Sequence, residues 1–176
     1  MGSRRIQNPK PRHLTIRKAT ADDNDAMFKV FYRAVREGAA KYYTEKQRAA
    51  WAPSSEPDHT PKHHNLLRWV AEMDGNIIGF IAVTRQGYID LAYVLPEWMG
   101  HGVAQALYDQ LFEWAHAARL SELTSHASHF AKRFFLKNGW LVVYPETVAR
   151  GDQKLQRFFM RLKLETQHET PDKPCR

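Results

Sequence analysis

The chain has 176 residues, of which 43% are hydrophobic and 12% aromatic, and its formal net charge is +7. This length and composition suit one compact domain with a sizeable core. No apolar run reaches the roughly 20 residues needed to span a bilayer, and the start of the chain lacks the apolar centre of a signal peptide. We therefore expect a soluble, cytoplasmic protein without a membrane partner.

The positive charge concentrates at the start of the chain, where the first 18 residues hold six Lys and Arg and no acid. We expect residues 1–12 to form a basic disordered arm, residues 13–165 a single domain and residues 166–176 a polar tail. Such arms are usually solvated, so nucleic acid is not an expected partner. The one cysteine, Cys175, lies in the tail, which excludes an internal disulfide.

The first half of the domain predicts a strand followed by two helices. Residues 13–19 alternate as a short strand, and residues 20–38 place acids in a first turn and apolar residues at helical spacing. Thr44 and Gln47 match a capping box that begins a second short helix ending near Trp51. The Pro- and Ser-rich segment 52–65 predicts a long loop.

The second half begins with strands. Asp74-Gly75 separates two apolar runs, which is a strong hairpin signal. The other predicted elements are a third strand at 88–95, a long helix at 102–119, a strand at 121–127, a helix at 128–138 and two closing strands at 140–148 and 155–164. We therefore predict an α+β fold in which helices cover a mostly antiparallel sheet.

A glycine pair stands between the third of these strands and the long helix. A helix that begins directly after a strand leaves its first N–H groups without acceptors, and Gly100 and Gly102 permit close approach to them. The helix dipole adds partial positive charge, so a pyrophosphate suits this place. A plain glycine-rich loop is the alternative.

The same block resembles motif A of the GNAT superfamily of acetyl-CoA-dependent N-acetyltransferases. That motif reads Gln or Arg, two residues, Gly, one residue, then Gly or Ala, and here it is met at Gly102 and Ala104 but not at Met99. The segments "YTEKQRAAW", "GYIDLAYVLPEW", "ASHFAKRFFLKNGW" and "RGDQKL" are similar to a YafP-like branch of bacterial acetyltransferases. The resemblance covers residues 13–165 and implies a sheet splayed between its fourth and fifth strands, with helices on both faces.

The resemblance implies that the splayed strand binds pantetheine through its backbone and that the glycine loop binds the pyrophosphate. Ser128 stands where relatives place an Asn that contacts the cofactor, although a helix N-cap is an equal alternative. Lys137 is expected either to reach a phosphate or to face solvent. The expected cofactor-binding residues are Ala92, Tyr93, Val94, Gly100, His101, Gly102, Val103, Ala104, Gln105, Ser128, Phe135 and Lys137.

The resemblance also bears on the proton transfers. Phe135 occupies the position of the Tyr that protonates the departing thiolate, so the usual general acid is absent, and Tyr93 or Tyr144 could replace it. A thiolate with a pKa near 8.5 also leaves tolerably by itself. Asp90, on the strand that leads into the cofactor site, is the expected acceptor of the amine proton, with a solvent-facing role as the alternative.

The acceptor pocket of such enzymes is walled by the first helices and the loop after them. Tyr43 and Trp51 supply aromatic surface there for an aromatic or cationic acceptor, although such residues are more often core. No metal is expected, because His59, His63 and His64 have no Cys or acid at ligand spacing, and His126 and His129 straddle a strand-to-helix junction.

From these residues we expect an N-acetyltransferase that moves the acetyl group of acetyl-CoA to a small amine by direct attack in a ternary complex. The alternative is a module that binds acyl-CoA with little turnover, as the residues at positions 99 and 135 suggest. The sequence leaves the oligomeric state open, with a homodimer through an exposed sheet edge as one option.

Overall fold

The computed structural model describes residues 13–57 and 65–165, so the expected arm and tail and part of the 52–65 loop lie outside the described residues. The observed order of elements is the predicted one: a strand, two helices, three strands, a helix, a strand, a helix and two strands. The helices and strands are β1 (Leu14–Lys18), α1 (Asn24–Arg36), α2 (Glu45–Trp51), β2 (Leu67–Met73), β3 (Asn76–Val83), β4 (Tyr88–Val94), α3 (Val103–Ala117), β5 (Glu122–Ala127), α4 (His129–Lys137), β6 (Leu141–Arg150) and β7 (Gln153–Lys163).

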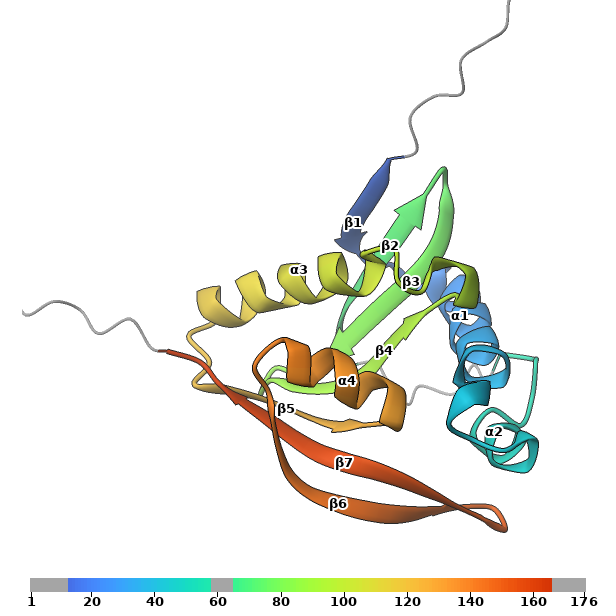
Figure 1. Cartoon of the computed structure of the whole chain (residues 1–176). Coiled ribbons are helices and arrows are strands. Elements are labelled where there is room, and N and C mark those ends of the chain that lie inside the picture. Colours follow the sequence, from blue (N-terminus) through green and yellow to red (C-terminus); the bar gives the residue numbers. More distant parts are fainter. Residues whose placement is uncertain (1–12, 58–64, 166–176) are drawn as a thin grey trace, which may run out of the picture.

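The strands form one seven-stranded sheet in the order β1-β2-β3-β4-β5-β7-β6 (Figure 1). Neighbouring strands are antiparallel, except that β4 and β5 run parallel. A parallel pair needs a crossover connection, and α3 supplies it between β4 and β5. The predicted α+β class with a mostly antiparallel sheet is therefore confirmed.

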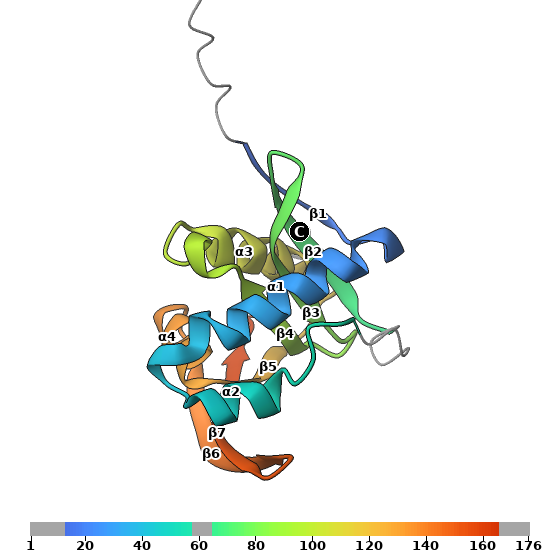
Figure 2. The same ribbon diagram turned by 90° about the vertical axis from the view of Figure 1, so that its right-hand side faces the viewer.

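Helices cover both faces of the sheet (Figure 2). Helix α3 packs on β1 to β4 on one face, and its buried Leu107 and Leu111 belong to the largest core cluster. Helix α1 packs on β3 and β4 on the other face, where its Met27 and Val30 meet Phe80. The apolar positions of both helices recur at the spacing that the sequence predicted, so each helix buries one stripe against the sheet.

Short local elements refine three predicted boundaries. The first predicted helix begins with a 3₁₀ turn at Ala21–Asp23, and Asp23 is tied to Arg17 of β1 by hydrogen bonds of 2.8 and 2.9 Å. A second 3₁₀ turn, Gly38–Lys41, follows α1, and a third, Pro96–Trp98, connects β4 to the glycine loop. None of the helices in the described ranges combines the length and apolar character that a membrane span requires.

Candidate active site

The two parallel strands separate soon after they meet. Their pairing in the described residues is limited to Tyr88 with Thr124 and Ile89 with Ser125. The buried hydroxyl of Ser125 donates to the carbonyl oxygen of Ile89 at 2.9 Å and holds the strands together at the last pair. Beyond this point β4 and β5 diverge (Figure 1), and we call this divergence the fork. The predicted splay between the fourth and fifth strands is present.

A β-bulge in β4 lies at the start of the fork. Val83 of β3 pairs with Ile89, whereas Ala82 pairs with Leu91, so Asp90 is the additional residue of the bulge. The bulge reverses the alternation of β4, because Ile89 packs in the core under α3 while Leu91 packs in the cluster under α1. Asp90 is exposed. Bulges beside active sites re-aim side chains in this way.

The backbone of β4 beyond the bulge directs polar groups into the fork. The N–H of Leu95 donates to the carbonyl of Ile78 at 2.8 Å. Because bonded pairs alternate along an antiparallel ladder, Tyr93 also bonds to β3, and Ala92 and Val94 turn their N–H and C=O toward β5. The backbone groups of Tyr93 therefore face β3, and of the three residues predicted to bind pantetheine through the backbone, only its two neighbours direct these groups into the fork.

The glycine loop has the geometry that the sequence predicted. Gly100 and Gly102 have φ angles of +81° and +82°, a region that side-chain-bearing residues avoid. Gly102 is the N-cap of α3, and within the described part of the chain the N–H groups of the next three residues have no hydrogen-bond acceptor. The N-terminus of α3 is thus free to bind an anion.

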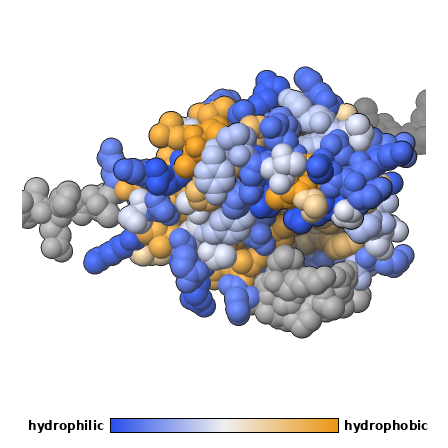
Figure 3. Space-filling view, turned by 90° about the horizontal axis from the view of Figure 1, so that it is seen from below, coloured by the Kyte–Doolittle hydropathy of each residue, from blue (hydrophilic) through white to orange (hydrophobic). Residues whose placement is uncertain are grey.

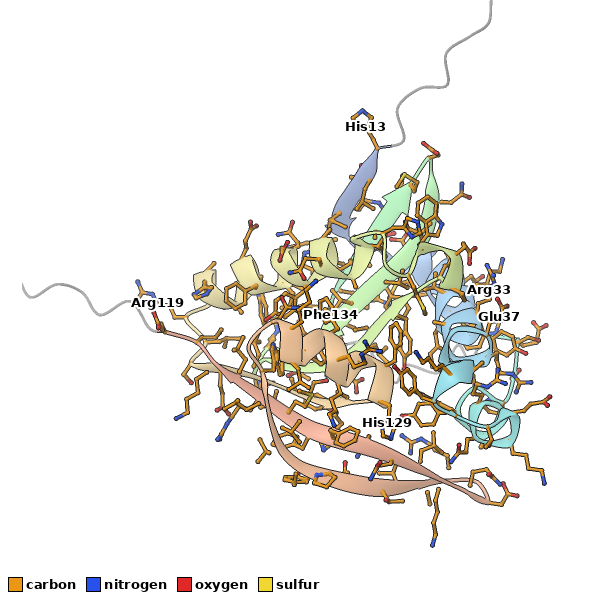
Figure 4. All side chains as sticks on the ribbon, viewed as in Figure 1. His13, Arg33, Glu37, Arg119, His129 and Phe134 are labelled. Carbon is orange, nitrogen blue, oxygen red and sulfur yellow. The ribbon has the colours of Figure 1, made fainter. Side chains whose placement is uncertain are left out.

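Helix α1 and the residues that follow it contact this loop. Arg33 forms ion pairs of 2.8 Å with Glu97, just before the loop, and with Glu37 at the end of its own helix, and Figure 4 labels Arg33 and Glu37 at that helix end. These bonds lower the pKa of both carboxyl groups. The Met99 side chain lies against Gly38, where an added Cβ would come within 2.5 Å of it. Met99, the departure from motif A, therefore anchors the loop by packing.

The other predicted phosphate-loop residues differ in what they can offer. His101 is exposed, whereas the side chain of Val103 is buried in the core, so only its backbone can reach a ligand. Ala104 is exposed on the first turn of α3. The side-chain amide of Gln105 donates to the side-chain oxygen of Asn138 at 3.1 Å, which links the start of α3 to the end of α4.

Helix α4 places its three predicted residues differently. The hydroxyl of Ser128 accepts from the N–H of Ala131 at 3.2 Å, so it is the N-cap, and its own hydrogen stays available to a second partner. Lys137 is exposed in the last turn. Phe135 is 2% exposed and packs on Trp140 with ring centroids 4.4 Å apart. This burial corrects the expectation that the ring of Phe135 borders the cofactor.

The predicted acceptor residues belong to an aromatic cluster between α2 and β4. The hydroxyl of Tyr43 donates to the carbonyl of Gln156 and accepts from the N–H of His129, and its ring is 5% exposed. Tyr43 therefore joins α4 to β7 as a structural residue, which corrects its assignment to the pocket wall. Figure 4 shows His129 at this junction. Trp51 is half-buried and packs against Tyr93.

Tyr93 lies on the α1 side of the sheet. Its ring contacts Phe31 edge-on at 5.1 Å and Phe80 at 5.7 Å. Burial raises the pKa of its phenol well above the usual range, and the charge of Asp90 acts in the same direction, whereas the hydrogen bond with Trp51 acts against it. Tyr93 therefore keeps its proton at neutral pH.

A chain of polar side chains, which the sequence did not single out as a site, crosses the sheet at the fork. The Tyr88 hydroxyl lies 3.0 Å from Nδ1 of His126, and Nε2 of His126 lies 3.0 Å from Oε1 of Glu146. Arg157 donates to the same Glu146 oxygen. These residues come from four strands, so sequence spacing alone could not bring them together. In the described ranges, no three His, Cys, Asp or Glu side chains gather as a metal site.

Residues 37–162 match the Acetyltransferase (GNAT) domain family. The uncharacterized N-acetyltransferase YafP of Escherichia coli (strain K12) is 33% identical over 151 residues, which cover 86% of this chain and 97% of that protein.

Two solved structures show the same fold. A GCN5-related N-acetyltransferase from Rhodopseudomonas palustris superposes with a TM-score of 0.79 at 26% identity, covering 93% of this chain and 100% of that one. The PaiA N-acetyltransferase of Thermoplasma acidophilum, in complex with coenzyme A, superposes with a TM-score of 0.68 at 19% identity, covering 86% of this chain and 99% of that one. With the family match and the YafP similarity, these findings show that the chain belongs to the GNAT family of acetyl-CoA-dependent N-acetyltransferases.

Proposed function

We propose that this enzyme transfers the acetyl group of acetyl-CoA to the amine of a small molecule by direct attack in a ternary complex. The observation that carries the proposal is the fork: free backbone groups of Ala92 and Val94 line one strand, and the N-terminus of α3 follows directly beyond them. An extended amide-bearing chain that ends in a pyrophosphate matches both features.

Acetyl-CoA is held mostly by backbone groups in this proposal. Ala92 and Val94 pair with the pantetheine amides, and the N–H groups of residues 102–105 bind the pyrophosphate. His101 and the free hydrogen of Ser128 add side-chain contacts, and Lys137 reaches a phosphate from the end of α4. Because backbone groups dominate, replacement of the motif residue at position 99 by Met does not remove the site.

The amine is proposed to enter beside Asp90, at the bulge. Most amines are protonated at pH 7, so a carboxylate there both attracts the ammonium group and accepts a proton from it. Tyr93, which keeps its proton, is the proposed donor to the departing thiolate. Trp51 supplies aromatic surface for the acceptor, and benzylamine and n-hexylamine, of similar size, test whether an aromatic acceptor is preferred.

The first test is the thermal midpoint of the purified protein with and without saturating acetyl-CoA, with desulfo-CoA and ATP for comparison. A ligand at 100 times its dissociation constant adds about 2.7 kcal/mol to the unfolding free energy. A rise with the CoA compounds and not with ATP supports the site. An unchanged midpoint would remove the proposed cofactor contacts.

A module that binds acyl-CoA without turnover is the second candidate, and the burial of Phe135 in place of a proton donor favours it. Thiol release from acetyl-CoA, measured with benzylamine, tryptamine and n-hexylamine as acceptors, separates the two candidates. Release that depends on the amine supports the enzyme. Binding of acetyl-CoA without release from any amine supports the module.

We also infer a homodimer through strand β6. This strand is an edge of the sheet, and its exposed apolar run consists of Leu141, Val142, Val143 and Tyr144. Figure 3 views the molecule from this side and shows apolar surface among hydrophilic residues. Unpaired edges of this kind associate readily. Sedimentation velocity tests the inference, and a Val143→Lys variant should shift a dimer to monomer.

A further inference from the structure

Chemistry at the fork needs more proton acceptors than Asp90 alone. A primary amine enters with three protons on nitrogen and leaves as an amide with one, so two protons must depart. A carboxylate holds one proton at a time. The second proton therefore needs another acceptor close to the place where β4 and β5 part.

The register of the strands puts such an acceptor at the fork. Thr124 pairs with Tyr88 and Ser125 with Ile89, so the next residue of β5, His126, stands across the opening from Asp90. The negative charge of Asp90 also acts on Tyr88, whose pKa is raised by burial and then by that charge. Tyr88, Asp90 and His126 thus surround the start of the fork.

The hydrogen bonds fix where the protons of this group lie. A carboxylate can only accept, so the Nε2 of neutral His126 carries the hydrogen that points to Glu146. Nδ1 of His126 is then the basic nitrogen, and it accepts from the hydroxyl of Tyr88 at 3.0 Å. The Tyr88 oxygen also accepts a hydrogen bond from the backbone N–H of His126, which leaves it one lone pair for the amine. The order Tyr88, His126, Glu146 is that of the hydroxyl, imidazole and carboxylate groups in a catalytic triad.

Building on the proposed function, we propose that Tyr88, His126 and Glu146 form a proton relay for acetyl transfer. Tyr88 is the catalytic residue that touches the amine, while His126 and Glu146 act behind it as positioning residues. Glu146 fixes the imidazole orientation, and Arg157 holds Glu146 in turn.

The proposed step balances as follows. The ammonium gives its first proton to Asp90, and the amine nitrogen bonds to the thioester carbonyl carbon. This nitrogen then gives a second proton to the Tyr88 oxygen as the Tyr88 hydroxyl proton moves to Nδ1 of His126. The carbon–sulfur bond breaks, and coenzyme A leaves with the electron pair as a thiolate. Tyr93 donates its hydroxyl proton to the thiolate and regains one of the two protons taken from nitrogen. The other proton is released to solvent, which His126, 20% exposed, can reach.

The surroundings of His126 suit a base that is neutral at pH 7. Burial lowers the pKa of His126 below its usual value, and the charge of Arg157 lowers it further, while Glu146 opposes this. The imidazole is therefore unprotonated at neutral pH and able to accept. As the pH falls through this lowered pKa, His126 becomes protonated and the relay stops.

The test measures kcat and kcat/KM for acetylation of benzylamine between pH 5 and pH 9. Tyr88→Phe should lower kcat about 100-fold, in the range of general base catalysis, while acetyl-CoA still raises the thermal midpoint. Glu146→Gln should move the acid limb of kcat/KM to lower pH, because it removes a charge that raises the pKa of His126. Arg157→Gln should move that limb to higher pH.

The matched control Tyr32→Phe, on α1, carries the same chemical change as Tyr88→Phe away from the fork and should leave the profile unchanged. His116→Gln removes an imidazole from α3 and should leave it unchanged as well. If the acid limb of kcat/KM stays in place in both Glu146→Gln and Arg157→Gln, and kcat of Tyr88→Phe is near that of wild type, the relay is overturned while the proposed function stands. A wild-type protein that binds acetyl-CoA but acetylates none of the three probe amines would overturn the proposed enzyme and the relay together.

Discussion

The two sides of the fork differ in which part of the chain makes the site. On the proposed cofactor side, backbone N–H and C=O groups of β4, the glycine loop and the first turn of α3 form most of the surface, all within residues 92–105. On the proposed acceptor side, side chains form the surface, and Asp90, Trp51 and His126 come from three different elements.

This difference has a physical consequence for substitutions. A backbone site depends on conformation, so it tolerates Met99 but not the loss of a positive φ angle. A side-chain site depends on particular functional groups and on the pKa values that their neighbours set. Cofactor binding and turnover should therefore respond to separate sets of variants.

The largest effect is expected from Asp90→Asn. Removal of the carboxylate at the bulge should lower kcat about 100-fold, because an amide accepts no proton. Acetyl-CoA binding, measured by calorimetry, should stay at the wild-type value, since the side chain lies outside the cofactor contacts. Asp152→Asn, in the turn between β6 and β7, is the control. A kcat near wild type would remove Asp90 from the mechanism.

Phe135→Tyr restores the side chain that the family places on this helix. The ring is buried against Trp140, so the added hydroxyl enters an apolar site and should cost about 1–3 kcal/mol of unfolding free energy. Denaturant unfolding measures this loss, and kcat should not rise. Phe130→Tyr, at an exposed position of the same helix, should leave stability unchanged. A faster enzyme of unchanged stability would place position 135 beside the thioester.

Gly102→Ala tests the backbone side. At a φ angle of +82° a Cβ costs about 1–2 kcal/mol, although no atom of the described residues, apart from those next to Gly102 in the chain, lies within 4 Å to obstruct it. If the loop relaxes to avoid this strain, acetyl-CoA should bind about tenfold more weakly, which corresponds to about 1.4 kcal/mol. Gly151→Ala, also at positive φ but in the β6–β7 turn, should affect stability and not affinity. Equal affinities in the two variants would argue against a conformational site.

The same contrast explains how much of the molecule the sequence could predict. The hairpin at Asp74-Gly75, the strand before the glycine pair and the helix after it are local patterns, and each was predicted near its observed place. Local patterns also predicted the glycine loop as the place for the cofactor, and the groups proposed to bind it belong to consecutive residues.

Other features depend on contacts between distant strands, which local patterns do not contain. The bulge at Asp90 changes which face of the sheet Leu91 and its neighbours occupy, and strict alternation cannot reveal it. The pairing of Tyr88 with His126 and Glu146 follows from the strand order β4-β5-β7-β6. For Phe135, helical spacing allowed either face, and packing against Trp140 decided it.

The smallest expected effect is the pH dependence of stability that His126 contributes. Its pKa is lower in the folded protein than in the unfolded chain, where it is about 6.5, so the unfolded chain binds the proton more tightly. This contribution is fully present above that value and is lost as the pH falls through the folded pKa. The unfolding free energy of His126→Gln, from urea titrations at pH 7.5 and pH 5.5, should therefore fall less on acidification than that of wild type.

The control is His116→Gln, whose exposed ring lies on α3, away from the relay. Its unfolding free energy should fall on acidification as much as that of wild type. If both variants followed the wild-type slope, His126 would not be held neutral by its surroundings, and the acid limb of catalysis would have to arise from another group.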